Sequence, residues 1–171
     1  MSSVQAPHGK QSRRLRTGAA LMTLAGLAFV GYAAVFLVLN FTGSFLELGI
    51  GPDQVDKGKA DVEEFSPQLY HYISHLHLAI SGFIAATGLA IAGLSWYGVR
   101  RGESWAFTTA VIVPVVGLAI SVPAHYPFGL ATLEHLGPVY LAVLIFVAGA
   151  GAAYSGLRTR ETPEGVALPP Q

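Results

Sequence analysis

The chain has 171 residues, of which 52% are hydrophobic and 12% are charged, and its formal net charge is zero. Soluble domains carry about 25% charged residues, so a composition this poor in charge is typical of a helical membrane protein. The lack of cysteine excludes disulfides, thiolate metal sites and thiol redox chemistry, and the balanced charge gives no reason to expect a nucleic-acid partner.

Four stretches without Asp, Glu, Lys or Arg predict four membrane-spanning helices. The charge-free stretches cover residues 17–46, 65–99, 104–133 and 136–157. Each exceeds the roughly 20 residues that a helix needs to cross the hydrocarbon core of a bilayer. We expect the spans near residues 19–40, 70–97, 106–124 and 139–157. The first is expected to be retained, because it is longer than the ~7–15 apolar residues of a signal peptide.

Local signals predict where two of these helices begin and where one bends. Ser66 and Pro67 form an N-cap followed by proline at the first helical position, which predicts the start of the second span. Gly137 and Pro138 predict a similar start for the fourth span. Pro114 lies inside the third span and indicates a kink.

The connecting segments carry the charge. Segment 41–66 contains six acidic residues against two lysines, and it is expected to be an outer loop with a short interfacial helix. Its charge fits either a solvated face or a vestibule that attracts cations. Of the ten Lys and Arg residues, eight lie in the N-terminal arm, the 98–104 hairpin and the C-terminal tail. The positive-inside rule therefore predicts a cell-membrane protein with cytoplasmic N- and C-termini.

Together these features predict an all-α integral membrane protein, built as an antiparallel four-helix transmembrane bundle. The membrane domain is expected to cover residues 17–158. A basic cytoplasmic arm at 1–16 and a cytoplasmic tail at 159–171 are both expected to be disordered. The lipid bilayer is the expected surrounding, and other membrane subunits are candidate partners.

Five histidines are expected at the outer end of this bundle. They are His71, His75 and His77 near the outer end of the second span, His125 at the end of the third, and His135 before the fourth. His71 and His75 are four residues apart and share a helix face. Gly117 and Ser121 precede His125 at helical spacing, and small residues on a membrane helix usually face another helix. His125 is therefore expected to point into the bundle.

This cluster suggests a metal or haem site. Imidazole is the commonest metal ligand in proteins and suits Zn, Cu and Fe. The candidate metal ligands are His71, His75, His125, His135 and Glu134. His75 and His125 are the expected cofactor-binding pair, because a haem needs two histidines on facing helices. The expected pocket lining adds His77, Ser121, Tyr126 and Asn40. The leading hypothesis is an outward-facing His-rich pocket with a membrane redox or metal-handling role.

The histidines also fit roles that involve no metal. Tyr, Trp and His gather at membrane interfaces because they combine apolar rings with polar tips, so the cluster need not bind anything. Clustered His and Glu at a membrane mouth can also relay protons. The alternatives are a non-enzymatic accessory subunit of a larger membrane complex, or a four-helix protein that binds a small molecule or lipid. Whether the chain is an enzyme is left open.

One hairpin carries a family resemblance. The segment LSWYGVRRGESWAF, residues 94–107, places Trp96 and Trp105 on either side of Arg100 and Arg101. It resembles the cytoplasmic hairpin of small four-span bacterial membrane proteins such as the DoxX-like proteins. The resemblance implies a four-helix membrane architecture, and some DoxX-like proteins are linked to thiosulfate or quinone redox chemistry. We transfer the architecture and no activity.

Overall fold

The computed structural model describes residues 8–45 and 47–161, and every regular element among them is helical. The elements are α1 (His8–Thr42), α2 (Lys59–Phe65), α3 (Pro67–Gly93), a π-helical turn η1 (Leu94–Gly98), a 3-10 turn η2 (Val99–Arg101), α4 (Ser104–His125) and α5 (Leu133–Glu161). No strand occurs in this described part of the chain, so the all-α prediction is confirmed there.

Four helices are long and apolar enough to cross a membrane. They cover Arg13–Thr42, Pro67–Arg101, Ser104–His125 and Leu133–Arg158. Each predicted span falls inside one of them, which confirms the prediction of four candidate spans. The helices also continue beyond the predicted ends. α1 begins at His8, inside the 1–16 arm, and α5 runs to Glu161, inside the 159–171 tail. The remainder of both segments, 1–7 and 162–171, lies outside the described residues.

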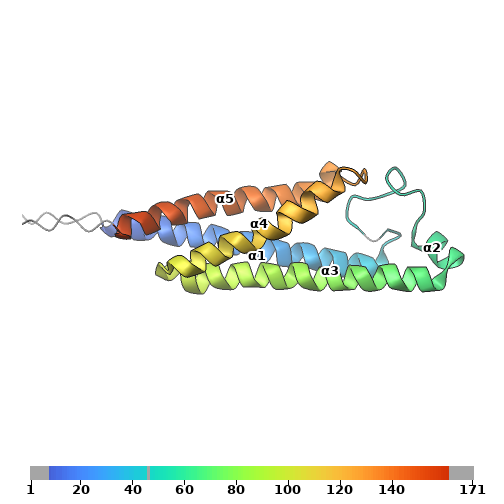
Figure 1. Cartoon of the computed structure of the whole chain (residues 1–171), viewed down its shortest axis with the longest axis horizontal. Coiled ribbons are helices and arrows are strands. Elements are labelled where there is room, and N and C mark those ends of the chain that lie inside the picture. Colours follow the sequence, from blue (N-terminus) through green and yellow to red (C-terminus); the bar gives the residue numbers. More distant parts are fainter. Residues whose placement is uncertain (1–7, 46, 162–171) are drawn as a thin grey trace, which may run out of the picture.

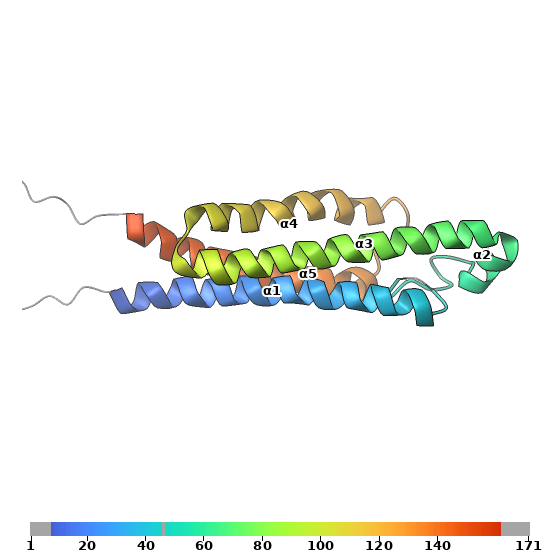
Figure 2. The ribbon, with the colours of Figure 1, turned by 90° about the horizontal axis from the view of Figure 1, so that it is seen from below.

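α1 is the helix around which the others are arranged. It packs along α3 and along α5, and the start of α1 and the end of α5 lie at the same end of the molecule (Figures 1 and 2). α1 and α3 come together at Gly26 and Gly88. A Cβ atom added to Gly88 would lie 2.6 Å from the carbonyl oxygen of Gly26. Glycine is required there because it lets two membrane helices approach backbone to backbone.

α4 is held less closely than the other long helices. It contacts α3 and α5 over short stretches and runs obliquely across the other helices in Figure 1. Pro114 lies inside α4, as expected, and is buried there. The kink expected at Pro114 stays a prediction. The exposed residues of α4, among them Ile112, Val116 and Ile120, are bulky and apolar, as expected for a surface that faces lipid.

Capping residues set where two of the long helices begin. Ser66 caps α3, because its Oγ atom accepts a hydrogen bond from the backbone N–H of Leu69 at 3.3 Å, and this confirms the predicted start. The predicted start of the fourth span at Gly137 and Pro138 is wrong. α5 begins at Leu133, because the hydroxyl of Thr132 accepts a hydrogen bond from the backbone N–H of His135 at 3.1 Å. Pro138 consequently lies inside the helix.

The outer loop contains the expected short helix, α2, and is attached to the end of α1. The Lys59 ammonium donates to the carbonyl oxygens of Leu39 and Asn40, at 2.8 and 2.9 Å. A cation at this position stabilises the exposed carbonyls of a helix C-terminus. The loop is thereby held over the end of α1 and the start of α3.

Candidate functional site

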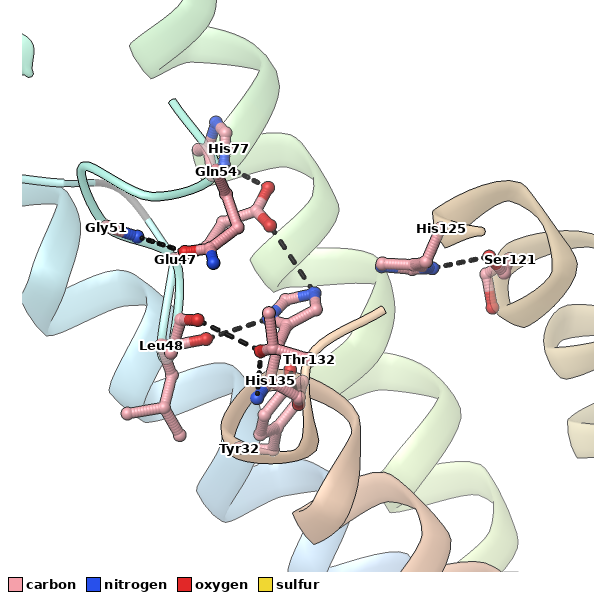
Figure 3. A network of polar contacts seen from close by, with 11 residues as sticks. Tyr32, Glu47, Leu48, Gly51, Gln54, His77, Ser121, His125, Thr132 and His135 are labelled. Atoms are coloured by element: carbon pink, nitrogen blue, oxygen red, sulfur yellow. Dashed lines mark hydrogen bonds and ion pairs between the residues drawn. The ribbon is translucent and has the colours of Figure 1, made fainter. Parts of the chain in front are cut away.

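The carboxylate of Glu47 lies between two imidazoles from different helices (Figure 3). Its Oε1 atom is 2.9 Å from Nε2 of His77 on α3. Its Oε2 atom is 3.4 Å from Nε2 of His135 on α5. Glu47 itself belongs to the loop that follows α1. One acidic side chain thus joins three segments that are far apart in the sequence.

The opposite nitrogens of both rings are already occupied. Nδ1 of His77 lies 3.2 Å from the carbonyl oxygen of Ile73, and Nδ1 of His135 lies 2.8 Å from that of Leu48. A backbone carbonyl only accepts hydrogen bonds, so each Nδ1 carries the hydrogen and donates it. A neutral ring would then turn the lone pair of its Nε2 atom toward the carboxylate of Glu47. A favourable contact therefore requires a further proton between Nε2 and the carboxylate.

The surroundings favour an ionised Glu47. Burial by itself would raise the pKa of Glu47, but the hydrogen bond from His77 and the electrostatic influence of the imidazoles of His135, His77 and His125 outweigh it. The pKa of Glu47 therefore lies below its ordinary value. With an ionised carboxylate, the shared proton belongs to the imidazole of His77. Glu47 and His77 form a hydrogen-bonded acid–base pair.

Burial around the pair is uneven. The side chain of His135 is 2% exposed, that of His77 is 14% exposed, and that of Glu47 is 26% exposed. Phe36 of α1 lies buried against both imidazoles, with ring centroids 6.3 Å from His77 and 6.2 Å from His135. Water therefore reaches the group from the side of Glu47.

Short contacts fix the loop that carries Glu47 against the start of α5. The hydroxyl of Thr132 donates to the carbonyl oxygen of Gly49 at 3.0 Å, and Tyr32 of α1 donates to the carbonyl oxygen of His135 at 3.1 Å. Gly49 has a positive φ of 70°, and a Cβ atom there would lie 2.6 Å from backbone and side-chain atoms of Glu134. No other residue fits this turn without moving the loop.

His125 extends the group toward α4. Its ring centroid lies 4.9 Å from that of His135. Its Nδ1 atom donates to the carbonyl oxygen of Ser121 at 2.7 Å, which leaves its Nε2 atom directed away from its own helix backbone (Figure 3). Glu47, His77, His135 and His125 together are called the polar cluster below.

A pocket of about 180 Å³ lies beside the polar cluster, and Glu47 and His77 line it. Most of its other lining residues are apolar and come from the outer loop, α2, α3 and the connection between α4 and α5: Phe45, Ile50, Val55, Val62, Ile73 and Leu130. Lys57, Lys59 and Tyr70 add polar groups at its edge. An engineered cavity of about 150 Å³ admits benzene, so one small ring or a short chain fits here.

The predicted site residues divide into two sets. His125, His135 and His77 come together in the polar cluster, whereas His71 and His75 lie on an exposed face of α3. Glu134 is exposed, too. Among the described residues no hydrogen bond, ion pair or ring contact joins His75 to His125. Three or more His, Asp or Glu side chains arranged to hold a metal ion are likewise not found in the described ranges.

Two expected pocket residues have other partners. Asn40 is buried and exchanges hydrogen bonds with the hydroxyl of Ser74, at 2.9 and 3.0 Å, which joins α1 to α3. The hydroxyl of Tyr126 lies 2.9 Å from that of Tyr140 on the exposed surface. Ser121 contributes its backbone carbonyl to His125. Asn40 thus supports the outer end of the helix pair instead of lining the pocket.

The sequence analysis does not place Glu47 in the candidate site. It counts Glu47 only as one of the acidic residues of the outer loop. One signal distinguishes it from the others. Glu47 follows directly on the charge-free stretch 17–46 and is surrounded by apolar residues in FLELGI, whereas the remaining acids of the loop lie among polar residues. An isolated acid in an apolar segment at a membrane surface indicates a partner.

Comparisons with protein-family models, with curated proteins and with solved structures find no significant match to this chain.

Proposed function

We propose that this chain is a four-span membrane protein that binds a small molecule at its outer face and exchanges a proton with it. In this proposal the long helices form an antiparallel bundle in the cell membrane, with both termini in the cytoplasm. The Lys and Arg residues of the arm, the 98–104 hairpin and the tail support this orientation. The neighbouring positions of the start of α1 and the end of α5 agree with it (Figure 1).

The position of Glu47 between the two imidazoles carries the proposal. Each imidazole has its Nδ1–H committed to a backbone carbonyl, so only the Nε2 side can gain or lose a proton. An acid and an imidazole within hydrogen-bonding distance form a pair that can take a proton from a bound molecule or give one to it. Because the carboxylate of Glu47 is partly exposed, water can reach the pair and restore its protonation state after the exchange.

The pocket supplies the place for the molecule. Glu47 and His77 supply an acid–base pair to its lining, Lys57, Lys59 and Tyr70 add further ionisable groups, and apolar side chains form most of the remainder. Such a pocket suits a small, largely apolar molecule with one group that forms hydrogen bonds or ionises. The apolar wall supplies affinity and the Glu47–His77 pair supplies orientation and proton exchange.

The test is a titration of the purified protein with a panel of small aromatic acids, amines and alcohols. Calorimetry in two buffers of different ionisation enthalpy counts the protons exchanged on binding. We expect at least one class to bind with a linked proton, and Glu47→Gln to remove that proton. His71→Phe, at an exposed position of the same helix, should leave binding and proton count unchanged.

The same preparation decides between this function and the metal or haem hypothesis. Binding without a linked proton in every class would contradict proton exchange. A stoichiometric amount of Zn, Cu or Fe by elemental analysis, or a haem band in the visible spectrum, would favour a metal-handling role instead. His75→Ala and His125→Ala would then be the variants that release the metal or haem.

A further inference from the structure

A second cavity lies between α3 and α4, within the candidate membrane spans. Its volume is about 230 Å³. Its walls come from α3, from α4 and from Phe29 of α1. The lining is aliphatic and aromatic apart from the hydroxyls of Thr87 and Ser121. Both walls are candidate membrane spans, so the cavity is accessible to molecules dissolved in a bilayer.

The cavity is long and narrow. On α3 its lining runs from Ile80 to Ile91, a distance of about 16 Å at about 1.5 Å per helical residue. A cavity of about 230 Å³ between two neighbouring helices is too small for another helix, which is about 10 Å across. The shape fits a single flexible hydrocarbon chain.

The sequence of α4 explains why the space exists. Gly117 contributes no side chain, and a Cβ atom added there would have no neighbour within 4 Å. Pro114, also in the lining, cannot donate a backbone hydrogen bond and weakens the regular helix at this depth. α4 is also the long helix with the shortest stretches of contact. The residues of α4 that face α3 therefore account for the cavity.

Beyond the outer end of the cavity, both of its walls continue to residues of the polar cluster. Ile80 is its outermost lining residue on α3, and His77 stands one helical turn farther out. Ser121 is its outermost lining residue on α4, and His125 stands one turn beyond it, bonded to the Ser121 carbonyl. Both walls thus lead from apolar side chains to imidazoles, as a site for an amphiphile requires.

We infer that this cavity holds the hydrocarbon chain of a lipid-soluble amphiphile whose oxygen-bearing head group reaches the imidazole of His125. The inference goes beyond the proposed function, because the α3–α4 cavity shares no lining residue with the pocket beside Glu47 and His77. The chain site itself depends only on the α3–α4 cavity, so it is testable apart from the acid–base pair.

The experiment uses the full chain in phospholipid nanodiscs and a C16 fatty acid that carries a diazirine in the middle of its chain. After irradiation, labelled peptides are mapped by mass spectrometry. We expect label on the α3 and α4 segments around Ile84, Thr87 and Leu118. Gly117→Leu should lower this label by roughly tenfold, which corresponds to about 1.4 kcal/mol of chain binding.

Gly151→Leu is the matched control. Gly151 lines the neighbouring cavity between α4 and α5, which shares Phe29, Pro114 and Leu118 with the α3–α4 cavity, and a Cβ atom at Gly151 also has no neighbour within 4 Å. Its substitution should leave the label at Ile84 and Thr87 unchanged, because these two residues line only the α3–α4 cavity. Thr87→Phe fills the same cavity from α3 and should repeat the effect of Gly117→Leu. If one of these two variants misfolds, the other still provides the test.

Three outcomes would overturn the inference. They are label spread evenly over the outer surface, label equally reduced by Gly151→Leu, and labelled chains crosslinked to a second copy through α4. Glu47→Gln separates the two proposals. If the cavity is labelled in this variant while the linked proton is lost, both stand. If wild type is labelled but exchanges no proton with any ligand, the chain site stands and the proposed function fails.

Discussion

In the folded chain, Nε2 of His77 lies 2.9 Å from Oε1 of Glu47, although the two residues are 30 positions apart in the sequence. The same carboxylate contacts His135 with its other oxygen. The contact therefore does two things. It holds the outer loop against α3 and α5, and it places a proton between two ionisable groups at the wall of a pocket.

Glu47→Gln should make stability less dependent on pH. The pKa of Glu47 is lowered in the folded chain, so the carboxylate contributes stability above its ordinary pKa of 4.5, and this contribution is lost as the pH falls through the lower folded-state value. The variant should lose roughly 1–3 kcal/mol at pH 7. Thermal unfolding in detergent should show the gap to wild type closing below pH 4.5. Glu134→Gln, at an exposed carboxylate, serves as the control.

Gly49→Ala should displace the loop that carries Glu47. The added Cβ atom meets Glu134 and the backbone nitrogen of His135 at 2.6 Å, and the positive φ is unfavourable for alanine. We expect a loss of about 1–3 kcal/mol. Gly51→Ala has open space around its Cβ position and should be nearly neutral. Equal melting temperatures for the two variants would refute the account of this turn.

Ser74→Ala should leave the buried amide of Asn40 without its partner on α3. The expected cost is about 0.5–2 kcal/mol. The double variant Asn40→Leu with Ser74→Ala removes both polar groups and should recover much of that loss. A double-mutant cycle from thermal or denaturant unfolding measures the coupling. Strict additivity of the two changes would mean that this hydrogen bond does not join α1 to α3.

Gly88→Val should separate α1 from α3, because its side chain would collide with the backbone of Gly26. Overpacking of this kind costs typically about 1–3 kcal/mol. Gly82→Val, earlier on α3, enters open space and provides the matched control. Cysteine crosslinking between the outer halves of α1 and α3, in a chain that otherwise lacks cysteine, would report the separation directly.

The four candidate spans could be predicted from the sequence because hydrocarbon demands uninterrupted apolar helices. The gathering of His125 and His135 at one end also followed from their positions at helix ends. Both signals are local: a run of residue types and its boundaries. The start of α5 was predicted wrongly because proline is a strong local signal, and the competing cap from Thr132 uses a hydroxyl that is common in loops.

Which histidine of α3 joins the polar cluster could not be predicted from the sequence, because it depends on the rotation of α3 about its own axis. His75 and His77 are two residues apart and point to different faces of the helix. The Gly26–Gly88 contact fixes the rotation of α3 against α1 and turns His77 inward. Glu47 could not be assigned because its loop folds back through contacts of Gly49 with Thr132 and of Leu48 with His135, and these pair residues more than 80 positions apart.

The most direct test of the central claim is a ¹⁵N NMR measurement of histidine-labelled protein in nanodiscs at pH 7. The account predicts that the imidazole of His77 carries protons on both ring nitrogens, assigned by the loss of its signals in His77→Phe. Glu47→Gln should then remove the proton from Nε2 while Nδ1 keeps its bond to Ile73. An Nε2 atom of His77 that is unprotonated in the wild-type protein would contradict the shared proton and, with it, the proposed exchange site.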